Sequence, residues 1–408
     1  MKKDYSFLFI IVVLYILVRS VNFTRHLNFS SEQASFTLKA RQLLENKKIE
    51  LIGPPISWRY GERYFFQGSI TYYAMIPLLI LGNWDPIVSS YMMVLLGAIM
   101  LVPLYYGAKL LFNQKSAEIL SYIFCFFPLF IDYSRFFWNP NLQLIFTPII
   151  ILWMGLFKKY QKTIFLFLVS LFSGILMLFH YQFFLVILGI FLYYFFFNKL
   201  SLKQKITFII GIPIGFSPLI VFELRNQFYN LNTLYLFILH FNTVFIKKNQ
   251  TFSLYYLLSI LLFIFLFISP HISHISKKIL FILGVVLCVI ITICYSVVPS
   301  SGFGMAKNWN YGMELQAHEI IKKNLVSNYN IVNLGYDTIA IVQKYLLIKD
   351  NIKGLSDDYY LNKYLYVITN KQDIMKNPAY EINTFTPNRI INSWKLNDKY
   401  TVYLLERL

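Results

Sequence analysis

Long apolar runs dominate the first 298 residues of this chain of 408 residues. A helix rises about 1.5 Å per residue, so roughly 20 apolar residues cross the hydrocarbon core of a bilayer, which is about 30 Å thick. The sequence therefore predicts an α-helical, polytopic membrane protein with about nine transmembrane helices. The runs lie at residues 5–18, 87–107, 117–133, 142–157, 164–179, 182–197, 206–222, 252–270 and 279–298.

The composition agrees with this class and excludes several others. Hydrophobic residues make up 57% of the chain and charged residues only 14%, whereas soluble domains average about 25% charged residues. The 40 Phe and 31 Tyr residues argue against a disordered chain. Cys125, Cys288 and Cys294 all lie within apolar runs, so we expect neither a disulfide framework nor a metal site from them.

The net charge of +18 predicts an orientation in the membrane. Many positive residues lie in short clusters between apolar runs, such as Lys158-Lys159 and Lys277-Lys278. The cytoplasmic loops of membrane proteins carry such an excess of Lys and Arg. The membrane arrangement therefore accounts for the positive charge, and we expect no nucleic-acid partner. The first apolar run ends directly at Arg19 without a cleavage site of small residues, which predicts a retained first helix with a cytoplasmic amino terminus in the plasma (cytoplasmic) membrane.

Residues 70–82 contain an apolar stretch that is too short for a straight crossing. If this stretch is interfacial, the lysine clusters all fall on the cytoplasmic side. An odd number of crossings then places the carboxyl terminus outside the cytoplasm. The same arrangement places the loops at residues 20–69, 134–141, 180–182 and 223–251 outside.

The composition changes near residue 299. Residues 299–408 are polar and mixed in charge, with a helical pattern at residues 313–325 and strand-like runs at residues 330–334, 364–369 and 400–406. The sequence predicts a transmembrane domain at residues 1–298 and a small extracytoplasmic α/β domain at residues 299–408. No internal repeat is visible, which counts against transporter folds built from duplicated halves.

Ionisable residues are nearly absent from the apolar runs and gather in the predicted outer loops. A transporter of charged solutes usually needs such groups near the middle of the bilayer, so chemistry at the outer surface is favoured. Glu32 follows Ser30 and Ser31 and is able to stabilise a first helical turn by about 0.3–1 kcal/mol. The outer loops also hold arginines, whose planar side chain binds two phosphate oxygens at once or lies among lipid head groups. These are Arg59, Arg63, Arg135 and Arg225.

Several short motifs, in this order, resemble those of polytopic GT-C glycosyltransferases, the bacterial relatives of protein O-mannosyltransferases and of the aminoarabinose transferase. The resemblance covers roughly residues 1–300 and, more weakly, the carboxyl-terminal domain, and it rests on several motifs taken together. The motifs are Glu32-Gln33 after the first helix, the LIGPPIS run at residues 51–57, residues 67–73 leading to Trp84-Asp85-Pro86, the SRFFWNPN run at residues 134–141, His180-Tyr181, and the FELRNQFYN run at residues 222–230.

The resemblance implies a hexosyltransferase that moves a sugar from a polyprenyl-phosphate carrier to a hydroxyl of a glycan, lipid or protein on the outer face. Its general base corresponds to Glu32, where the family more often has Asp. The resemblance also implies a group of residues that bind the donor phosphate or sugar: Arg225, Arg59, His180, Asn139, Glu223 and Gln33. Asp132 is a second carboxylate candidate. We predict no cofactor and no metal site, since Asn139-Pro140-Asn141 stands where some relatives carry paired acids, although a divalent ion is not excluded.

Other interpretations of the sequence stay open. The chain could be a transporter or flippase of lipid-linked sugars, or a membrane scaffold without catalysis. For single residues, Asn139 could cap a helix that begins at Pro140, His180 could be an ordinary interface residue, and Glu223 could form an ion pair with Arg225 or orient it.

Overall fold

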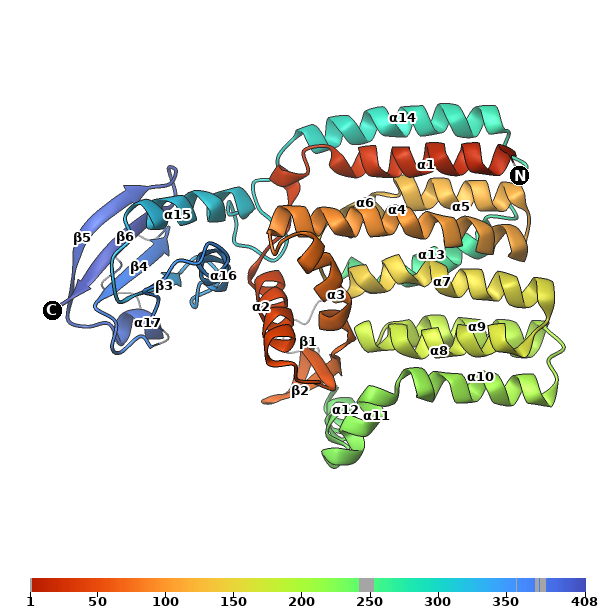
Figure 1. Ribbon diagram of the computed structural model, residues 1–408, viewed down its shortest axis with the longest axis horizontal. Helices are drawn as coiled ribbons and strands as arrows, with labels where there is room; N and C mark the ends of the chain where they lie inside the picture. The colour runs from red at the N-terminus through yellow and green to blue at the C-terminus, as the bar shows by residue number, and fades with distance from the viewer. Residues whose placement is uncertain (1, 242–252, 357, 371–373, 375–378) are drawn as a thin grey trace. The chain divides into compact units, whose positions relative to one another are not determined.

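A computed structural model describes the chain except for residues 1, 242–252, 357, 371–373 and 375–378 (Figure 1). It divides into two compact units. The helical unit contains Met1–Val21, Ala40–Leu81 and Ser89–Cys294, and the carboxyl-terminal unit contains Asn22–Lys39, Gly82–Val88 and Tyr295–Leu408. The sequence placed one boundary at residue 298; in the structure, two further segments of the chain belong to the carboxyl-terminal unit.

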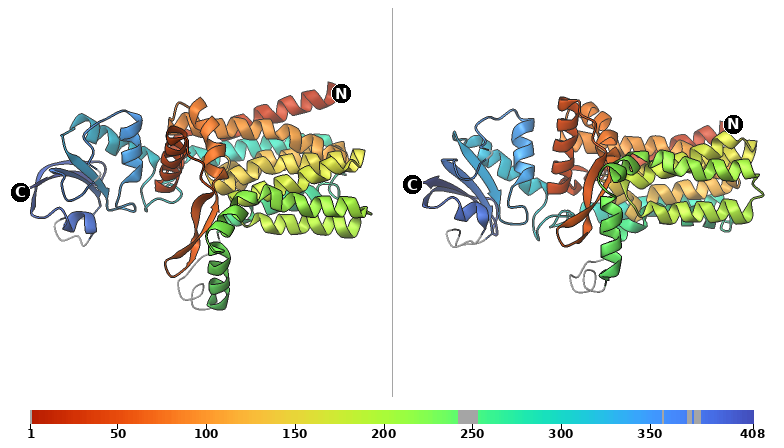
Figure 2. Two further views of the ribbon diagram at one scale, coloured as in Figure 1. Left: turned by 60° about the horizontal axis from the view of Figure 1, so that its bottom comes forward. Right: turned by 90° about the horizontal axis from the view of Figure 1, so that it is seen from below.

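Helices lie side by side through most of the helical unit (Figures 1 and 2). Among the described residues, Pro86–Leu111, Asn139–Tyr160 and Lys278–Ser296 are each long and apolar enough to cross a membrane, and α10 with α11 forms a fourth candidate that bends by 62°. A mostly helical membrane protein is thus confirmed, and the count of about nine crossings stays a prediction. The helices are α1 (Lys2–Ser20), α4 (Pro86–Leu111), α5 (Gln114–Phe126), α6 (Pro128–Asp132), α7 (Asn139–Tyr160), α8 (Thr163–Phe179), α9 (Phe183–Phe197), α10 (Leu202–Gly215), α11 (Ser217–Arg225), α12 (Tyr229–Leu239), α13 (Leu258–Ile268) and α14 (Lys277–Ser296).

Polar residues mark several helix starts between the apolar runs. The side-chain oxygen of Asn113 accepts the amide N–H of Ser116 at 2.9 Å at the start of α5. At the start of α10, Ser201 and Gln204 form a reciprocal capping box. Each arrangement satisfies amide groups that have no partner inside the helix.

Small residues allow close packing between helices of this unit. A Cβ atom at Gly215 of α10 would lie 2.0 Å from the carbonyl oxygen of Leu171, and one at Gly174 of α8 would lie 2.2 Å from the carbonyl oxygen of Ile212. Between α4 and α7, Gly107 and Gly155 meet in the same way. Such backbone contact is a main source of helix association in lipid, where burial of apolar surface gives little driving force.

Arg19 fixes the end of α1 inside the protein. Its side chain is fully buried and donates to Ser134 Oγ at 2.5 Å and to the carbonyl oxygens of Cys125, Phe124 and Phe130 at 2.9–3.1 Å. Two of these carbonyls end α5, where the negative end of the helix dipole stabilises a cation.

The first loop contains two helices and a hairpin. It holds α2 (Ser31–Asn46), the antiparallel strands β1 (Ile52–Tyr60) and β2 (Arg63–Gly68), and α3 (Ile70–Leu81). A helix start at Ser30 or Ser31 was expected, and the hairpin was not. The 12 residues of α3 extend about 18 Å, which is too short for a straight crossing and suits the predicted interfacial position.

The carboxyl-terminal unit contains a four-stranded sheet in the order β3-β4-β6-β5. β3 pairs with β4 in parallel, and the other pairs are antiparallel. Separate apolar clusters form around Ile331 with Tyr366 and around Val332 with Val367, as expected when neighbouring residues point to opposite faces of a sheet. The elements are η1 (Thr24–His26), α15 (Tyr311–Lys323), β3 (Tyr329–Asn333), α16 (Ile341–Lys349), β4 (Tyr364–Thr369), α17 (Tyr380–Asn383), β5 (Asn388–Lys395) and β6 (Thr401–Arg407).

Candidate functional site

The hairpin β1–β2 is a meeting point in the helical unit for several predicted site segments. The side chain of Asn139, the first residue of α7, donates to the side-chain oxygen of Gln67 on β2 and to the carbonyl oxygen of Phe179, the last residue of α8, at 3.1 Å. The Tyr181 hydroxyl donates to the carbonyl oxygen of Phe66 on β2. Residues that lie far apart in sequence therefore form one polar network around β2.

A second connection joins β2 to α12. The side-chain oxygen of Asn230 accepts the amide N–H of Phe66 at 2.9 Å, and its nitrogen donates to the carbonyl oxygen of Phe66 at 3.2 Å. Asn230 is the last residue of the FELRNQFYN run. Its side-chain amide pairs with the N–H and C=O groups of Phe66 as the backbone of a neighbouring strand would. The interaction holds the start of α12 against the hairpin.

Glu223 supports the same helix start. One carboxylate oxygen accepts the amide N–H of Asn230 and the other accepts that of Leu231, both at 3.2 Å. A carboxylate at the amino end of a helix is favoured by the helix dipole. The described contacts of Glu223 are thus with α12 and not with Arg225, the partner that the sequence left open.

The predicted phosphate-binding arginines differ in their surroundings. Arg225 ends α11 with its side chain exposed. Arg59 on β1 is half-buried, and its guanidinium donates to the hydroxyl of Tyr64, the residue opposite it on β2, at 2.5 Å. Arg63 is also exposed at the start of β2. Arg135 is buried and donates to the carbonyl oxygen of Val21 at 2.9 Å, and Asp132 is exposed at the end of α6.

His180 follows α8 with only 6% of its surface exposed. Burial lowers the pKa of its imidazole to about 3, so the ring is neutral at physiological pH. Its Nδ1 accepts the amide N–H of Gln182 at 3.4 Å, which leaves the hydrogen on Nε2. The rings of Tyr255 and Tyr256 lie edge-on to it at 6.0 and 5.3 Å between centroids. The position suits a neutral hydrogen-bond donor and excludes a permanent cation.

The start of α7 differs by one residue from the alternative that the sequence left open. The helix begins at Asn139, and Trp138 occupies the capping position without a side-chain bond to the helix. The side chain of Asn141 is fully buried and donates to the carbonyl oxygen of Phe136 at 2.9 Å. Asn139 therefore does not cap the helix, and its side chain bonds to β2 and α8 instead.

Glu32 and Gln33 lie in the carboxyl-terminal unit, in the first turn of α2. The Glu32 side chain is exposed. The Gln33 side chain is buried, and its oxygen accepts both the amide N–H and the hydroxyl of Ser30, at 3.0 and 2.6 Å. Gln33 thus stabilises the helix start that presents Glu32. Glu32 thus stands in the first turn of α2, as expected for a carboxylate at a helix start, and its role as a base stays a prediction.

Three residues of the network around β2 were not among the predicted site residues, namely Gln67, Tyr181 and Asn230. Each lies inside a motif quoted for the resemblance, which was the signal that could have found them. No group of three or more His, Cys, Asp or Glu side chains suited to a metal ion occurs in the described part of the chain.

Comparison with protein families gives one match. Residues 70–222, from the start of α3 into α11, match the model of a family described as dolichyl-phosphate-mannose-protein mannosyltransferase. This match supports a glycosyltransferase of the GT-C type. The similarity favours the enzyme interpretation over the transporter and scaffold interpretations. No curated protein and no solved structure gives a significant match to the chain.

The matched segment contains part of the described network, whereas β2 with Gln67 and the start of α12 with Asn230 lie outside it. It includes α7, with Asn139, and the turn after α8, with His180 and Tyr181. Glu32, Gln33, Arg59, Glu223 and Arg225 lie outside the match, so their roles stay predictions.

Proposed function

We propose that this glycosyltransferase moves a sugar from a polyprenyl-phosphate carrier to an acceptor hydroxyl at the extracytoplasmic face of the plasma membrane. The observation that carries the proposal is the family match over residues 70–222, because the family is described by a lipid-phosphate-linked mannose donor. The apolar helices support it, since a polyprenyl tail needs no polar cavity inside the bilayer.

In this proposal Glu32 is the general base. Phosphate is a good leaving group, so the reaction needs one group that takes the acceptor proton and cations that stabilise the departing phosphate. A single displacement then inverts the configuration of the sugar carbon. The exposed carboxylate in the first turn of α2 supports this role, because a base must reach the substrate.

Arg225 is the first choice for binding the donor phosphate, and Arg59 is the second. The exposed side chain of Arg225 is available to two phosphate oxygens at once. Arg59 already bonds to Tyr64, so it must share its donors. His180 suits a sugar hydroxyl or the phosphate as a neutral donor. Asn139, Glu223 and Gln33 use their described hydrogen bonds to hold β2, α12 and α2 in place, and this positions the direct ligands.

The test is transfer from labelled polyprenyl-phosphate sugars by the purified full chain. We expect Glu32→Gln to lower kcat by a factor of about 100 or more, since general base catalysis contributes about 10²–10⁴-fold. Glu45→Gln is a matched control on the same helix, where it removes only a surface ion pair with Arg41 worth about 0.3–0.5 kcal/mol. Equal activity of the two variants would rule out Glu32 as the base.

A further inference from the structure

The three residues that precede α2 are part of the carboxyl-terminal unit. The Phe29 ring has 1% of its surface exposed and contacts the rings of Tyr311 on α15 and Tyr345 on α16, with centroids 5.6 and 5.2 Å away. The side-chain oxygen of Asn28 accepts the amide N–H of Phe303 at 2.9 Å. The segment is therefore held by the packing of Phe29 and by the hydrogen bond of Asn28.

Ser30 links this segment to the first turn of α2. It packs against Gly304, whose φ of +72° favours glycine and where a Cβ atom would lie 3.2 Å from Ser30 Oγ. Ser30 also donates twice to Gln33. Since Glu32 lies between Ser30 and Gln33, the carboxyl-terminal unit determines where its backbone sits.

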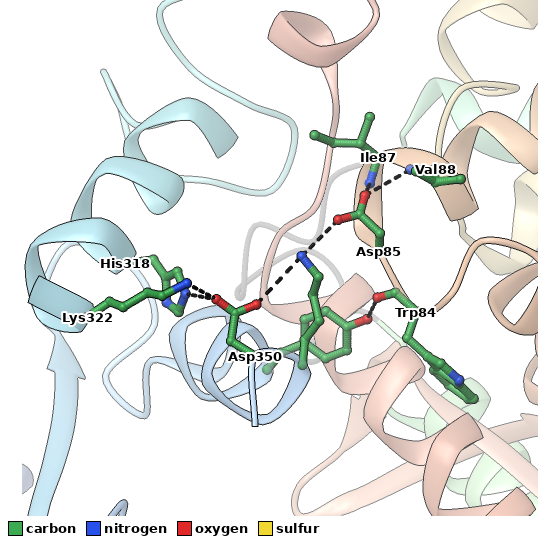
Figure 3. A network of polar contacts seen from close by, with 9 residues as sticks. Trp84, Asp85, Ile87, Val88, His318, Lys322 and Asp350 are labelled. Carbon is green, nitrogen blue, oxygen red and sulfur yellow. Dashed lines mark hydrogen bonds and ion pairs between the residues drawn. The ribbon is translucent and has the colours of Figure 1, made fainter. Parts of the chain in front are cut away.

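Helix α16 holds a second segment in the same unit (Figure 3). The Tyr345 hydroxyl donates to the carbonyl oxygen of Trp84. Lys349 lies 2.8 Å from one oxygen of Asp85, whose other oxygen caps the start of α4 at the amide groups of Ile87 and Val88. One helix of the carboxyl-terminal unit thus contacts both the segment before α2 and the start of α4.

We infer that the carboxyl-terminal unit positions Glu32, with Asn28 and Tyr345 as positioning residues. The inference rests on the proposed role of Glu32 as general base. It makes the unit part of the catalytic apparatus, although neither positioning residue touches the substrate. A shift of about 1 Å at a reacting group costs up to about 100-fold in rate, so loss of either contact has a measurable effect.

The test compares disruptive and conservative variants of the full chain. Asn28→Ala removes the acceptor for Phe303, whereas Asn28→Asp keeps it. Tyr345→Leu removes the ring beside Phe29, whereas Tyr345→Phe keeps it. We expect each disruptive variant to lower kcat by about tenfold or more with less than a twofold change in the donor KM, and each conservative variant to retain near-normal kcat.

Two further measurements separate positioning from a general loss of structure. In Asn28→Ala, hydrogen exchange becomes faster at residues 31–39 and stays unchanged in α15. In the Glu32→Gln background, Asn28→Ala lowers the remaining activity by less than twofold, because both changes remove the same function. A full additional tenfold loss in that background, or unchanged kcat in both disruptive variants, overturns the inference. Normal activity of Glu32→Gln alone would instead overturn the proposed role of Glu32 as general base.

Discussion

His180 couples the stability of the helical unit to pH. Burial lowers the pKa of its ring to about 3, and the pKa in an unfolded chain is about 6.5. Between these values the unfolded state binds more protons than the folded state. The sign follows from linkage: stability is fully present above about pH 6.5 and is lost as the pH falls. The loss from this one residue is about 1.4 kcal/mol at pH 5.5.

The first prediction is therefore a pH-dependent melting temperature. We expect the melting temperature of the purified protein in detergent to fall between pH 7.5 and pH 5.5, and that of His180→Asn to fall by less, since Asn does not titrate. The control is His240→Asn, which changes an exposed histidine of the same unit. An identical slope in His180→Asn and wild type would contradict the neutral buried ring.

Single residues also show what the sequence could reveal about the site. Glu32 and His180 became candidates through the motifs of the family resemblance, and their roles stay predictions. The contacts of Asn139 with Gln67 and of Glu223 with α12 could not be predicted, because each partner is fixed by tertiary packing. A polar residue beside a predicted helix end looks the same in sequence whether it binds a substrate or holds a strand.

Apolar runs located the helices but not their breaks. The run at residues 117–133 forms α5 and α6, which separate before Pro128, and the run at residues 206–222 bends by 62° near Pro218. Proline lacks the amide N–H that continues a helix, so both positions carried a signal. The hairpin was missed because Pro54 and Pro55 are disfavoured in strands. β5 was missed because most of its residues are exposed, which leaves no alternating apolar pattern.

The second prediction concerns the contact between α8 and α10. A Cβ atom at Gly215 would meet a backbone oxygen at 2.0 Å, and the backbone cannot move aside as a flexible side chain does. Overpacking typically costs about 1–3 kcal/mol, and we expect Gly215→Val to destabilise the helical unit by at least this much. The measurement is the melting temperature in detergent, which should fall. Gly189→Val is the control, because a Cβ atom at Gly189 would meet nothing within 4 Å. Equal melting temperatures of the two variants would contradict the close packing of α8 and α10.

The assignment of chain segments to the two units could be predicted only in part. The change in polarity near residue 299 gave the sheet and most of its strands. Nothing local to residues 22–39 or 82–88 shows that they belong to the same compact unit, because Phe29 and Tyr345 come together over more than 300 residues of chain. Long-range packing of this kind leaves no periodic pattern to recognise.

The third prediction tests the topology of the whole molecule. Nine crossings place Glu62 and Ser300 outside the cytoplasm and Lys162 and Lys203 inside, and all four side chains are exposed. In a chain whose three cysteines are replaced by Ala, we expect an impermeant thiol reagent to label Glu62→Cys and Ser300→Cys in intact cells. Lys162→Cys and Lys203→Cys should react only after permeabilisation. Eight crossings separate Glu62 from Ser300 in this arrangement, so labelling of only one of that pair would show that one apolar segment has been assigned wrongly. Labelling of Lys162→Cys in intact cells would reverse the predicted orientation and place the proposed base, phosphate-binding arginines and sugar transfer on the cytoplasmic side.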